Sequence, residues 1–461
     1  RLRFKVLSEN GGISEATNAA IDFARGDYIA FLDHDDILVP QALEICIDKA
    51  LSTSADAVYS DQETVDERDK NVWTFYKPDW SPEYLRHVMY VGHLLLVRRS
   101  LVMELGGFTK EFDGVQDYEF MLRLSELSDK VEHVNHVSYK WRAIAGSLAL
   151  ATDEKSGISE LQARAVQNHL DRLKVPGKAI AHPTRPHRCK IIPQLSVFPK
   201  VSIIIPTKDQ PDLIEKCLRS IFTNSSYLDF EVIVIDSGTT NTDALATLEK
   251  YPIRKFPFEG KFNFSEACNL GAEKASGEIL VFLNNDTEVI SKDWLEHFVF
   301  HLSRGDVGAV GPLLLYPDGK VQHAGVVLGA RGTADHVMRN FPADSDGYAG
   351  SLGCPREVSA VTAACLAIKK PLFDQINGFS ELYATHYQDV DLCLKMRSFS
   401  YRCIYTSDVR LYHHESPSRG GDKYDFLDRL LFIDTWGEMI NIGDPYYNKM
   451  FSLEKLNYSL K

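Results

Sequence analysis

The chain has 461 residues, of which 44% are hydrophobic and 25% charged, a composition typical of a globular protein with roughly two or three domains. Its net charge of −13 disfavours nucleic acid as a partner, and no apolar run approaches the roughly 20 residues that span a bilayer. The eight cysteines form no CxxC pair. We therefore expect buried or free thiols in a reducing compartment, although their even number leaves disulfides open.

The first part of the chain carries no signal-peptide pattern and starts in a strand-like run, residues 3–7, so we expect an incomplete first domain. A helix follows, with Ser14 as its predicted cap and Gly26 near its end. An apolar strand, residues 28–32, then stops at Asp33-His34-Asp35-Asp36. Ligands of open α/β sheets bind just beyond the carboxyl ends of strands. Carboxylates there can hold a metal ion and a phosphate, although one such run is also compatible with a plain polar turn.

The same succession of elements occurs a second time. Residues 14–36 match residues 265–287 without a gap at an offset of 251, and nine of the 23 positions are identical. The repeated strand, residues 278–283, is almost all apolar and shows no alternation, as in strands covered on both faces, and it ends at Asn284-Asn285-Asp286. This period is too long for a solenoid. We therefore predict a duplicated domain, with Asp35 and Asp286 in equivalent places.

The duplication continues downstream. Gly107-Phe108 and the run Gln116-Asp117-Tyr118-Glu119 correspond to Gly378-Phe379 and the run Gln388-Asp389-Val390-Asp391. Each acidic pair precedes an apolar helical run, and acidic residues at a helix start are favoured by the macrodipole alone. Their recurrence at matched places favours a shared chemical role.

The second domain begins with elements that the first domain lacks. A buried-type strand, residues 201–205, is stopped by Pro206, Pro211 opens a helix, and a strand at residues 231–235 ends at Asp236. This order predicts half of a nucleotide-binding sheet. The chain contains no G-x-G-x-x-G motif and no Walker loop, so phosphates must be held in another way. We expect a divalent metal on Asp286, because magnesium combines one or two carboxylates with substrate phosphates.

These observations divide the chain into four parts. Residues 1–150 form a domain without its first strand, first helix and second strand, and residues 151–199 form a helix followed by an extended proline-rich linker. Residues 200–420 form a complete domain, and residues 421–461 form a helical tail packed on it. The tail helix has an apolar face but few basic residues opposite, unlike interfacial membrane helices.

Several stretches together resemble family-2 glycosyltransferases of the GT-A fold. They are VSIIIPTKD, EVIVIDSGTT, FLDHDD, FLNNDT and the two QD pairs. YSDQETVDE, VQHAGVVLG and YHHESPSRG are similar to tandem enzymes of bacterial surface polysaccharide and O-antigen assembly, many of them rhamnosyltransferases. The resemblance implies an α/β fold with two GT-A domains, each a mostly parallel sheet flanked by helices.

For the second domain, the resemblance implies a role for each matching residue. The nucleotide-binding positions are Pro206, Thr207, Asp209, Asp236 and Asn285. Asp286 and His413 match metal ligands, with His414 as the alternative histidine, and Asn284 replaces the first aspartate of the DxD motif. Asp389 matches the general base. His414 and Arg419 match the substrate side, although Arg419 can equally face solvent and the two histidines can be an exposed pair.

For the first domain, the resemblance implies metal binding by Asp33 and Asp35 and a base at Asp117. Trp141 and Arg142 match substrate-binding positions, although Trp141 can equally be a buried anchor. Lys140 stands where relatives carry a histidine ligand, and it can neutralise a diphosphate but cannot bind a metal while protonated. Because the elements under the nucleotide base are absent, we expect this domain to bind donor poorly.

The expected activity is metal-dependent inverting transfer, with Mg²⁺ or Mn²⁺, from a nucleotide-sugar donor to an oligosaccharide or lipid-linked glycan. We expect dTDP-rhamnose as donor and a cytoplasmic location, with any contact to the inner face of the plasma membrane made through the acceptor. A bifunctional polymerase using UDP-hexoses or UDP-hexosamines is the enzymatic alternative. A non-catalytic carbohydrate- or nucleotide-binding scaffold, above all in the first domain, is the alternative of another class.

Overall fold

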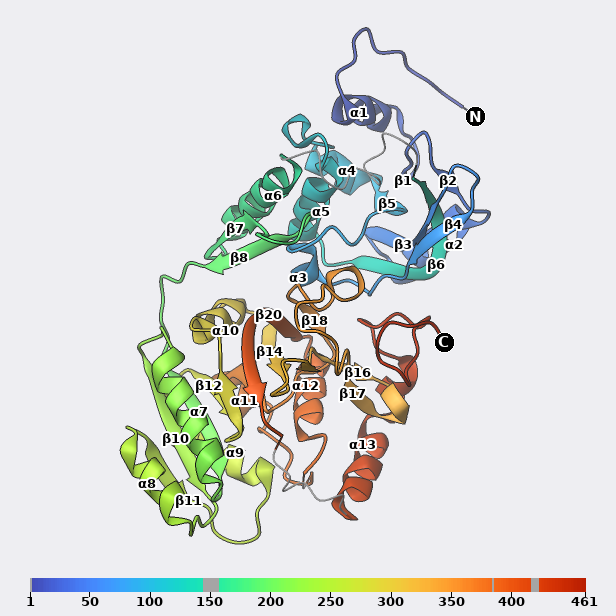
Figure 1. Cartoon of the computed structure of the whole chain (residues 1–461). Helices are drawn as coiled ribbons and strands as arrows, with labels where there is room; N and C mark the ends of the chain where they lie inside the picture. Colours follow the sequence, from blue (N-terminus) through green and yellow to red (C-terminus); the bar gives the residue numbers. More distant parts are fainter. Residues whose placement is uncertain (1, 144–156, 384, 416–422) are drawn as a thin grey trace. The chain divides into compact units, whose positions relative to one another are not determined.

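The computed structural model describes residues 2–143, 157–383, 385–415 and 423–461. The chain divides into two compact units, Arg1–Ile192 and Pro193–Lys461, called unit 1 and unit 2 below. Unit 1 runs from blue to green in Figure 1 and unit 2 from green to red. Each contains α-helices and a β-sheet, which confirms the predicted α/β class.

Unit 2 is built on a 10-stranded sheet with the order β11-β10-β9-β12-β19-β14-β20-β13, to which β15 and β18 add at β14 and β20. The first four strands run parallel, and β14 is parallel to β20, whereas β19 and β13 are antiparallel to their neighbours. The sheet is therefore mixed, and the predicted mostly parallel sheet is wrong in this respect. The apolar strand sequences indicated burial on both faces, which does not determine the direction of a strand. The strands are β9 (Val201–Thr207), β10 (Phe230–Asp236), β11 (Arg254–Pro257), β12 (Ile279–Leu283), β13 (Thr287–Val289), β14 (Val307–Leu315), β15 (Val321–His323), β18 (Arg356–Val358), β19 (Cys365–Lys369) and β20 (Arg402–His413).

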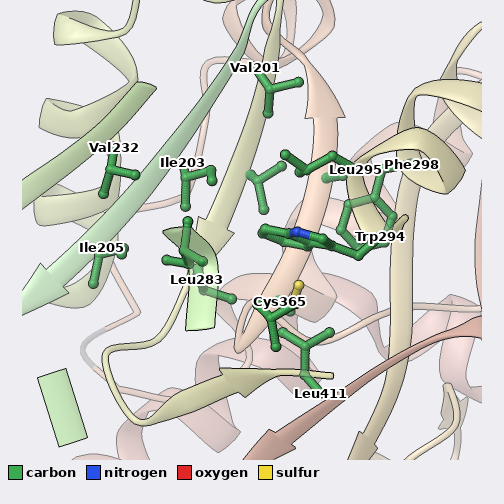
Figure 2. Close-up of a cluster of buried hydrophobic side chains, with 14 of the residues drawn as sticks. Val201, Ile203, Ile205, Val232, Leu283, Trp294, Leu295, Phe298, Cys365 and Leu411 are labelled. Carbon is green, nitrogen blue, oxygen red and sulfur yellow. The ribbon is translucent and has the colours of Figure 1, made fainter. Parts of the chain in front are cut away.

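Helices cover both faces of this sheet. On one face, Val201, Ile203 and Ile205 of β9 share a buried cluster with side chains of α7 and α10, where Figure 2 shows Trp294 and Phe298. On the other face, a Cβ at Gly271 of α9 would lie 2.3 Å from Ile204, so only glycine permits this close approach. The helices are α7 (Pro211–Asn224), α8 (Thr242–Lys250), α9 (Phe264–Lys274), α10 (Trp294–Leu302), α11 (Lys370–Gln375), α12 (Gln388–Ser398) and α13 (Lys423–Ile442), and a hairpin joins β16 (Val326–Leu328) to β17 (Ala334–His336).

Unit 1 repeats the second half of the unit 2 sheet. Its order β1-β5-β3-β6-β2 has the same strand directions as β12-β19-β14-β20-β13, and only β3 and β6 are parallel among its described pairs. The described residues contain no counterpart of β9 and β10. The elements are α1 (Ile13–Phe23), β1 (Tyr28–Phe31), β2 (Ile37–Leu38), α2 (Ala42–Thr53), β3 (Ala57–Val65), β4 (Asn71–Phe75), α3 (Pro82–Leu85), β5 (Leu95–Arg98), α4 (Arg99–Leu105), α5 (Gln116–Leu127), β6 (Val131–Arg142) and α6 (Ile158–Leu173).

The predicted strand at residues 3–7 is wrong, since the structure shows no regular element there. At the offset of 251, this run corresponds to β11, which pairs with β10. Unit 1 has no described counterpart of β10, so residues 3–7 have no strand to pair with, and Phe4 and Val6 are exposed. A strand needs a neighbour because its backbone groups must find partners.

The predicted extended linker at residues 174–199 is also wrong. Strands β7 (Gly177–Ala181) and β8 (Cys189–Pro193) form a two-stranded sheet, and the backbone and ring of His87 both hydrogen-bond to Cys189. Prolines at the turn between two short strands leave the pairing of those strands intact.

The predicted helix caps lie two residues too far along the chain. The N-cap residues are Gly12 and Asn263, and the Asn263 side chain accepts the Glu266 N–H at 3.2 Å. Ser14 and Ser265 are buried inside the first turns instead. All eight cysteines are buried and free, which agrees with the expected thiols. None of the helices in the described segments is both long and apolar enough to cross a membrane.

Candidate active site

A cavity of about 470 Å³ opens in unit 2, at the carboxyl ends of β9 and β12. Parallel strands end on one edge of the sheet, and their polar loops therefore meet there. Six predicted residues line the cavity: Pro206, Thr207, Asp209, Asn285, Asp286 and His413. The other lining residues are Lys208, Gln210, Ser237, Phe262, Phe264, Asn284, Thr385, His386, Gln388 and Glu415.

Hydrogen bonds join the strand ends across this cavity. The Asn285 side-chain amide donates to the Thr207 hydroxyl at 2.9 Å, which links β12 to β9. Asp209 accepts the backbone N–H groups of Asn241 and Thr240 at 2.9 and 2.8 Å, and these bonds lower the pKa of its carboxyl group. Asp236 accepts the Thr239 N–H at 2.8 Å. Asp209 therefore stays ionised, and the side chains of Asp209 and Asp236 together fix the shape of the loop after β10.

His413 and Asp286 form the most buried polar pair of the cavity. Antiparallel pairing of β13 with β20 sets Thr287 opposite His413, next to Asp286. The His413 Nε2 atom lies 3.1 Å from Asp286 Oδ1, and the two side chains are 6% and 8% exposed. On its other side, His413 Nδ1 lies 2.6 Å from Gln322 Oε1. An amide oxygen only accepts hydrogen bonds, so in a neutral imidazole the Gln322 contact favours the proton on Nδ1. The Nε2 lone pair would then be available to a cation placed between His413 and Asp286.

This arrangement fits a divalent cation. A carboxylate oxygen and an imidazole lone pair face each other, and an outer hydrogen bond fixes the histidine tautomer, as is common for metal-bound histidines. The Asn284 Nδ2 atom lies 3.3 Å from the same Nε2, and a 180° turn of this amide would present its oxygen to a cation as a further candidate ligand. Among the described residues, no three or more His, Cys, Asp or Glu side chains form a cluster suited to a metal. Asp286 and His413 would therefore leave several coordination positions for substrate phosphates.

Asp389 lies at the start of α12, next to the lining residue Gln388. Its Oδ2 accepts the Ala363 N–H at 2.9 Å, and its Oδ1 accepts the Val390 N–H at 2.9 Å. The first bond fixes the carboxylate against the loop before β19, and the second fixes its rotamer. A half-buried carboxylate held in this way retains lone pairs for an incoming hydroxyl proton.

The structure does not bring every predicted residue into the cavity. Asp236, Asp389 and His414 are absent from its described lining. His414 Nε2 lies 3.4 Å from Glu288, and this contact directs the ring to β13. Arg419 lies outside the described residues.

In unit 1, Asp33 and Asp35 follow β1 as Asn284 and Asp286 follow β12. Burial, and then the neighbouring Asp35, raise the pKa of Asp33. The His93 Nε2 atom lies 3.9 Å from Asp33 Oδ2, and burial lowers the pKa of this imidazole and raises that of Asp117. The described part of unit 1 therefore retains a group of acidic residues without counterparts of β9 and β10 beside it.

The strand register corrects the comparison made for Lys140. Ile37 and Glu288 are equivalent at the offset of 251, and they pair with Lys140 and Tyr412. Trp141, one residue further on, is therefore the counterpart of the candidate metal ligand His413. Lys140 pairs with Glu63 at 3.0 Å.

The two residues after Lys140 also serve the fold of unit 1. Trp141 packs against a buried cluster of unit 1, which supports the anchoring role. Arg142 pairs with Asp69 at 3.0 Å, and its backbone N–H donates to Asp36 at 2.8 Å.

Sequence reasoning missed Gln322, which orients His413, and the cavity residues Phe262 and His386. Gln322 belongs to the stretch VQHAGVVLG, which is similar to enzymes of O-antigen assembly, but the sequence assigned no role to any residue of that stretch. The contact depends on β15 pairing beside β14, a long-range arrangement without local signature.

Comparison with known proteins shows the family of the chain. The model of glycosyl transferase family 2 matches residues 1–106 and 202–352. The chain therefore belongs to this family, with one match in each unit.

Several proteins are similar to the chain. An uncharacterised protein, y4gI, of Sinorhizobium fredii is 36% identical over 100% of this chain and 52% of its own length. The O-antigen biosynthesis protein RfbC of Myxococcus xanthus is 34% identical over 100% of this chain and 36% of its own length. A chondroitin synthase of Pasteurella multocida is 34% identical over 30% of this chain and 14% of its own length. The chain thus spans about half of the first relative and about a third of the second.

A solved structure, GalNAc-T7 with UDP, GalNAc and Mn²⁺, aligns at a TM-score of 0.44 and 14% identity. The alignment covers 55% of this chain and 51% of that chain.

Proposed function

We propose that unit 2 is a metal-dependent inverting glycosyltransferase that transfers a sugar from a nucleotide-sugar donor to a growing cell-surface polysaccharide. The observation that carries the proposal is the buried pair of Asp286 and His413 in a cavity that also contains the predicted nucleotide residues. Family membership supports the reaction class. Similarity over the whole chain to a protein named for O-antigen biosynthesis supports the polysaccharide.

Each group has a task in this mechanism. Thr207, Asp209 and Asp236 bind the base and ribose at the ends of β9 and β10. Asp286 and His413 would hold Mg²⁺ or Mn²⁺, which stabilises the negative charge of a departing diphosphate when bound. Asp389 accepts the proton of the acceptor hydroxyl as that oxygen forms a bond to the anomeric carbon and the bond to the diphosphate breaks. A single displacement inverts the anomeric centre and leaves no covalent intermediate.

The donor sugar and the acceptor are finer proposals. dTDP-rhamnose is proposed from the resemblance to rhamnosyltransferases of the same subgroup. The similarity to a chondroitin synthase favours UDP-hexoses or UDP-hexosamines as the second candidate donors. A lipid-linked acceptor would bring the protein to the inner face of the plasma membrane without an inserted helix.

The test measures release of nucleoside diphosphate from dTDP-rhamnose, UDP-glucose and UDP-N-acetylhexosamines, with Mg²⁺ or Mn²⁺ and octyl glycosides as acceptors. Asp389→Asn should lower acceptor-dependent turnover by about 10²- to 10⁴-fold while nucleotide binding remains. Asp117→Asn, the matched change in unit 1, should leave the rate near that of the wild type. Full turnover in Asp389→Asn would show that the base is another residue. Nucleotide binding without turnover for any donor would favour the scaffold alternative.

A further inference from the structure

One face of helix α13 contacts the segment that leads to Asp389. Asp428, Phe432 and Trp436 are spaced by four residues and therefore lie along one face of the helix. Phe432 is fully buried and Asp428 is 3% exposed, whereas Phe426 and Leu430 of the same helix are largely exposed. The buried side of α13 is thus the side that carries these three residues.

Asp428 binds the backbone of this segment directly. Its Oδ2 atom accepts the N–H groups of Thr385 and His386 at 2.9 and 3.0 Å. Thr385 and His386 both line the cavity. A buried carboxylate that accepts two backbone N–H groups fixes the path of those residues more firmly than a neutral acceptor would.

Phe432 holds the next residue, Tyr387. The two rings stack with centroids 4.7 Å apart and an interplanar angle of 16°. Tyr387 has a φ of 65°, a left-handed conformation that is unfavourable for a residue with a side chain. The stack and the contact of the Tyr387 hydroxyl with Thr333 Oγ1 at 3.3 Å hold this conformation, from which α12 starts.

Trp436 extends the contact into α12. Its indole N–H donates to Asp391 Oδ1 at 3.1 Å, and Asp391 also pairs with Lys395 at 2.7 Å. The Asp391 N–H donates to the Tyr387 carbonyl at 2.7 Å, which closes the first turn around Asp389. The three residues of α13 therefore contact the chain on both sides of the candidate base.

We propose that α13 positions the acceptor side of the active site: Asp428, Phe432 and Trp436 hold the segment from Thr385 to Asp391, and so orient Asp389 toward the acceptor hydroxyl. The inference rests on the proposed function of unit 2. The three side chains are positioning residues, because none of them lines the cavity in the described structure. A misplacement of about 1 Å in a reacting group can cost on the order of 10²-fold in rate.

The test uses the full chain with Asp428→Ala and Phe432→Leu. Asp434→Ala is the matched control, since Asp434 lies on the exposed side of the same helix. Amide hydrogen exchange of residues 385–391 should rise on the order of tenfold in both variants, because the segment opens more often when its contacts are removed. Acceptor-dependent turnover should fall on the order of tenfold or more, while the Kd of UDP or dTDP with Mn²⁺ stays within about twofold of the wild type.

Phe432→Tyr keeps an aromatic ring for the stack on Tyr387, so its turnover should be higher than that of Phe432→Leu and near that of the wild type. If Asp428→Ala does not fold, Asp428→Asn takes its place in the test. Exchange and turnover equal to those of Asp434→Ala in the folded variants would overturn the proposal. A loss of nucleotide affinity as large as the loss of turnover would also overturn it, since α13 would then support the whole unit. If the wild type turns over no donor, the proposed function fails, while the exchange of residues 385–391 still decides whether α13 positions this segment.

Discussion

Asn269 and Phe379 exchange two hydrogen bonds, because the asparagine side chain donates to the Phe379 carbonyl and accepts the Phe379 N–H, both at 3.0 Å. Asn18 and Phe108 make the same exchange in unit 1, both at 2.8 Å. The asparagines are identical residues of the repeat, and each phenylalanine follows a glycine with positive φ. In both units, these hydrogen bonds therefore connect the helix of the repeat, α1 or α9, to the turn that precedes the candidate base, Asp117 or Asp389.

Asn269→Ala should destabilise unit 2. Two partly buried hydrogen bonds to backbone groups contribute about 1 kcal/mol each, so the free energy of unfolding should fall by about 2 kcal/mol. Asn441→Ala, at an exposed place near the end of α13, should change it by less than about 0.5 kcal/mol. Urea denaturation followed by circular dichroism measures both. Equal stability of the two variants would mean that solvent replaces these bonds at no cost.

Asp286→Ala and Asp35→Ala remove equivalent residues of the two units. The first should weaken Mn²⁺-dependent binding of UDP or dTDP by about tenfold or more, because it removes one of two candidate protein ligands. The second should leave binding unchanged, because unit 1 has no described counterpart of β9 and β10. Titration calorimetry of the full chain compares them. Weaker binding in Asp35→Ala would show that unit 1 binds nucleotide despite its shorter sheet.

The sequence predicted the parts of the site that depend on one chain segment. Strand β10 ends at Asp236 and β12 ends directly before Asn284, as the apolar runs that stop at polar residues predicted, whereas β9 continues through Pro206 to Thr207. The duplication of the sheet followed from the ungapped match of residues 14–36 with residues 265–287. Such signals are local, because burial and strand termination are both visible in a few consecutive residues.

Features that depend on pairing between distant segments were not predictable in this way. The equivalence of Trp141 and His413 depends on how β6 pairs with β2 and how β20 pairs with β13. The motif comparison alone assigned the neighbouring residue, Lys140, to the histidine position. The contact of Gln322 with His413 spans 91 residues, and the contacts of Asp428 span 42 and 43 residues. A one-residue change of register turns each side chain to the other face, so spacing alone cannot assign these partners.

Gln322→Leu should weaken metal binding without removing a ligand. The leucine leaves His413 Nδ1 without its acceptor, and loss of such an outer partner typically costs about ten- to hundredfold in metal affinity. Gln322→Glu keeps an acceptor oxygen and should retain most of the affinity. Binding of Mn²⁺ in the presence of UDP, followed by electron paramagnetic resonance, distinguishes them. Wild-type affinity in Gln322→Leu would show that His413 is oriented by other contacts.

Lys77 should give unit 1 a distinctive dependence of stability on pH. Its side chain is 0% exposed, and its ammonium group donates to the carbonyl oxygens of Val91 and His93. Burial lowers its pKa from 10.5 to about 7. Between these two values, the unfolded chain holds a proton that the folded chain has lost. The free energy of unfolding should therefore rise with pH by up to about 1.4 kcal/mol per pH unit across this window, and the residue should contribute no slope below about pH 7.

Lys77→Met removes the titrating group, so the difference in stability between wild type and variant should grow in favour of the wild type from pH 7 to pH 10. Lys70→Met, at an exposed position of unit 1, is the control and should keep the wild-type slope. Because the two units can unfold separately, amide hydrogen exchange in β3 and β5 at a series of pH values, corrected for the intrinsic rates, reports unit 1 alone. The same slope in Lys77→Met and in the wild type would show that Lys77 remains protonated in the folded chain, and that its charge is stabilised by the surrounding carbonyl groups.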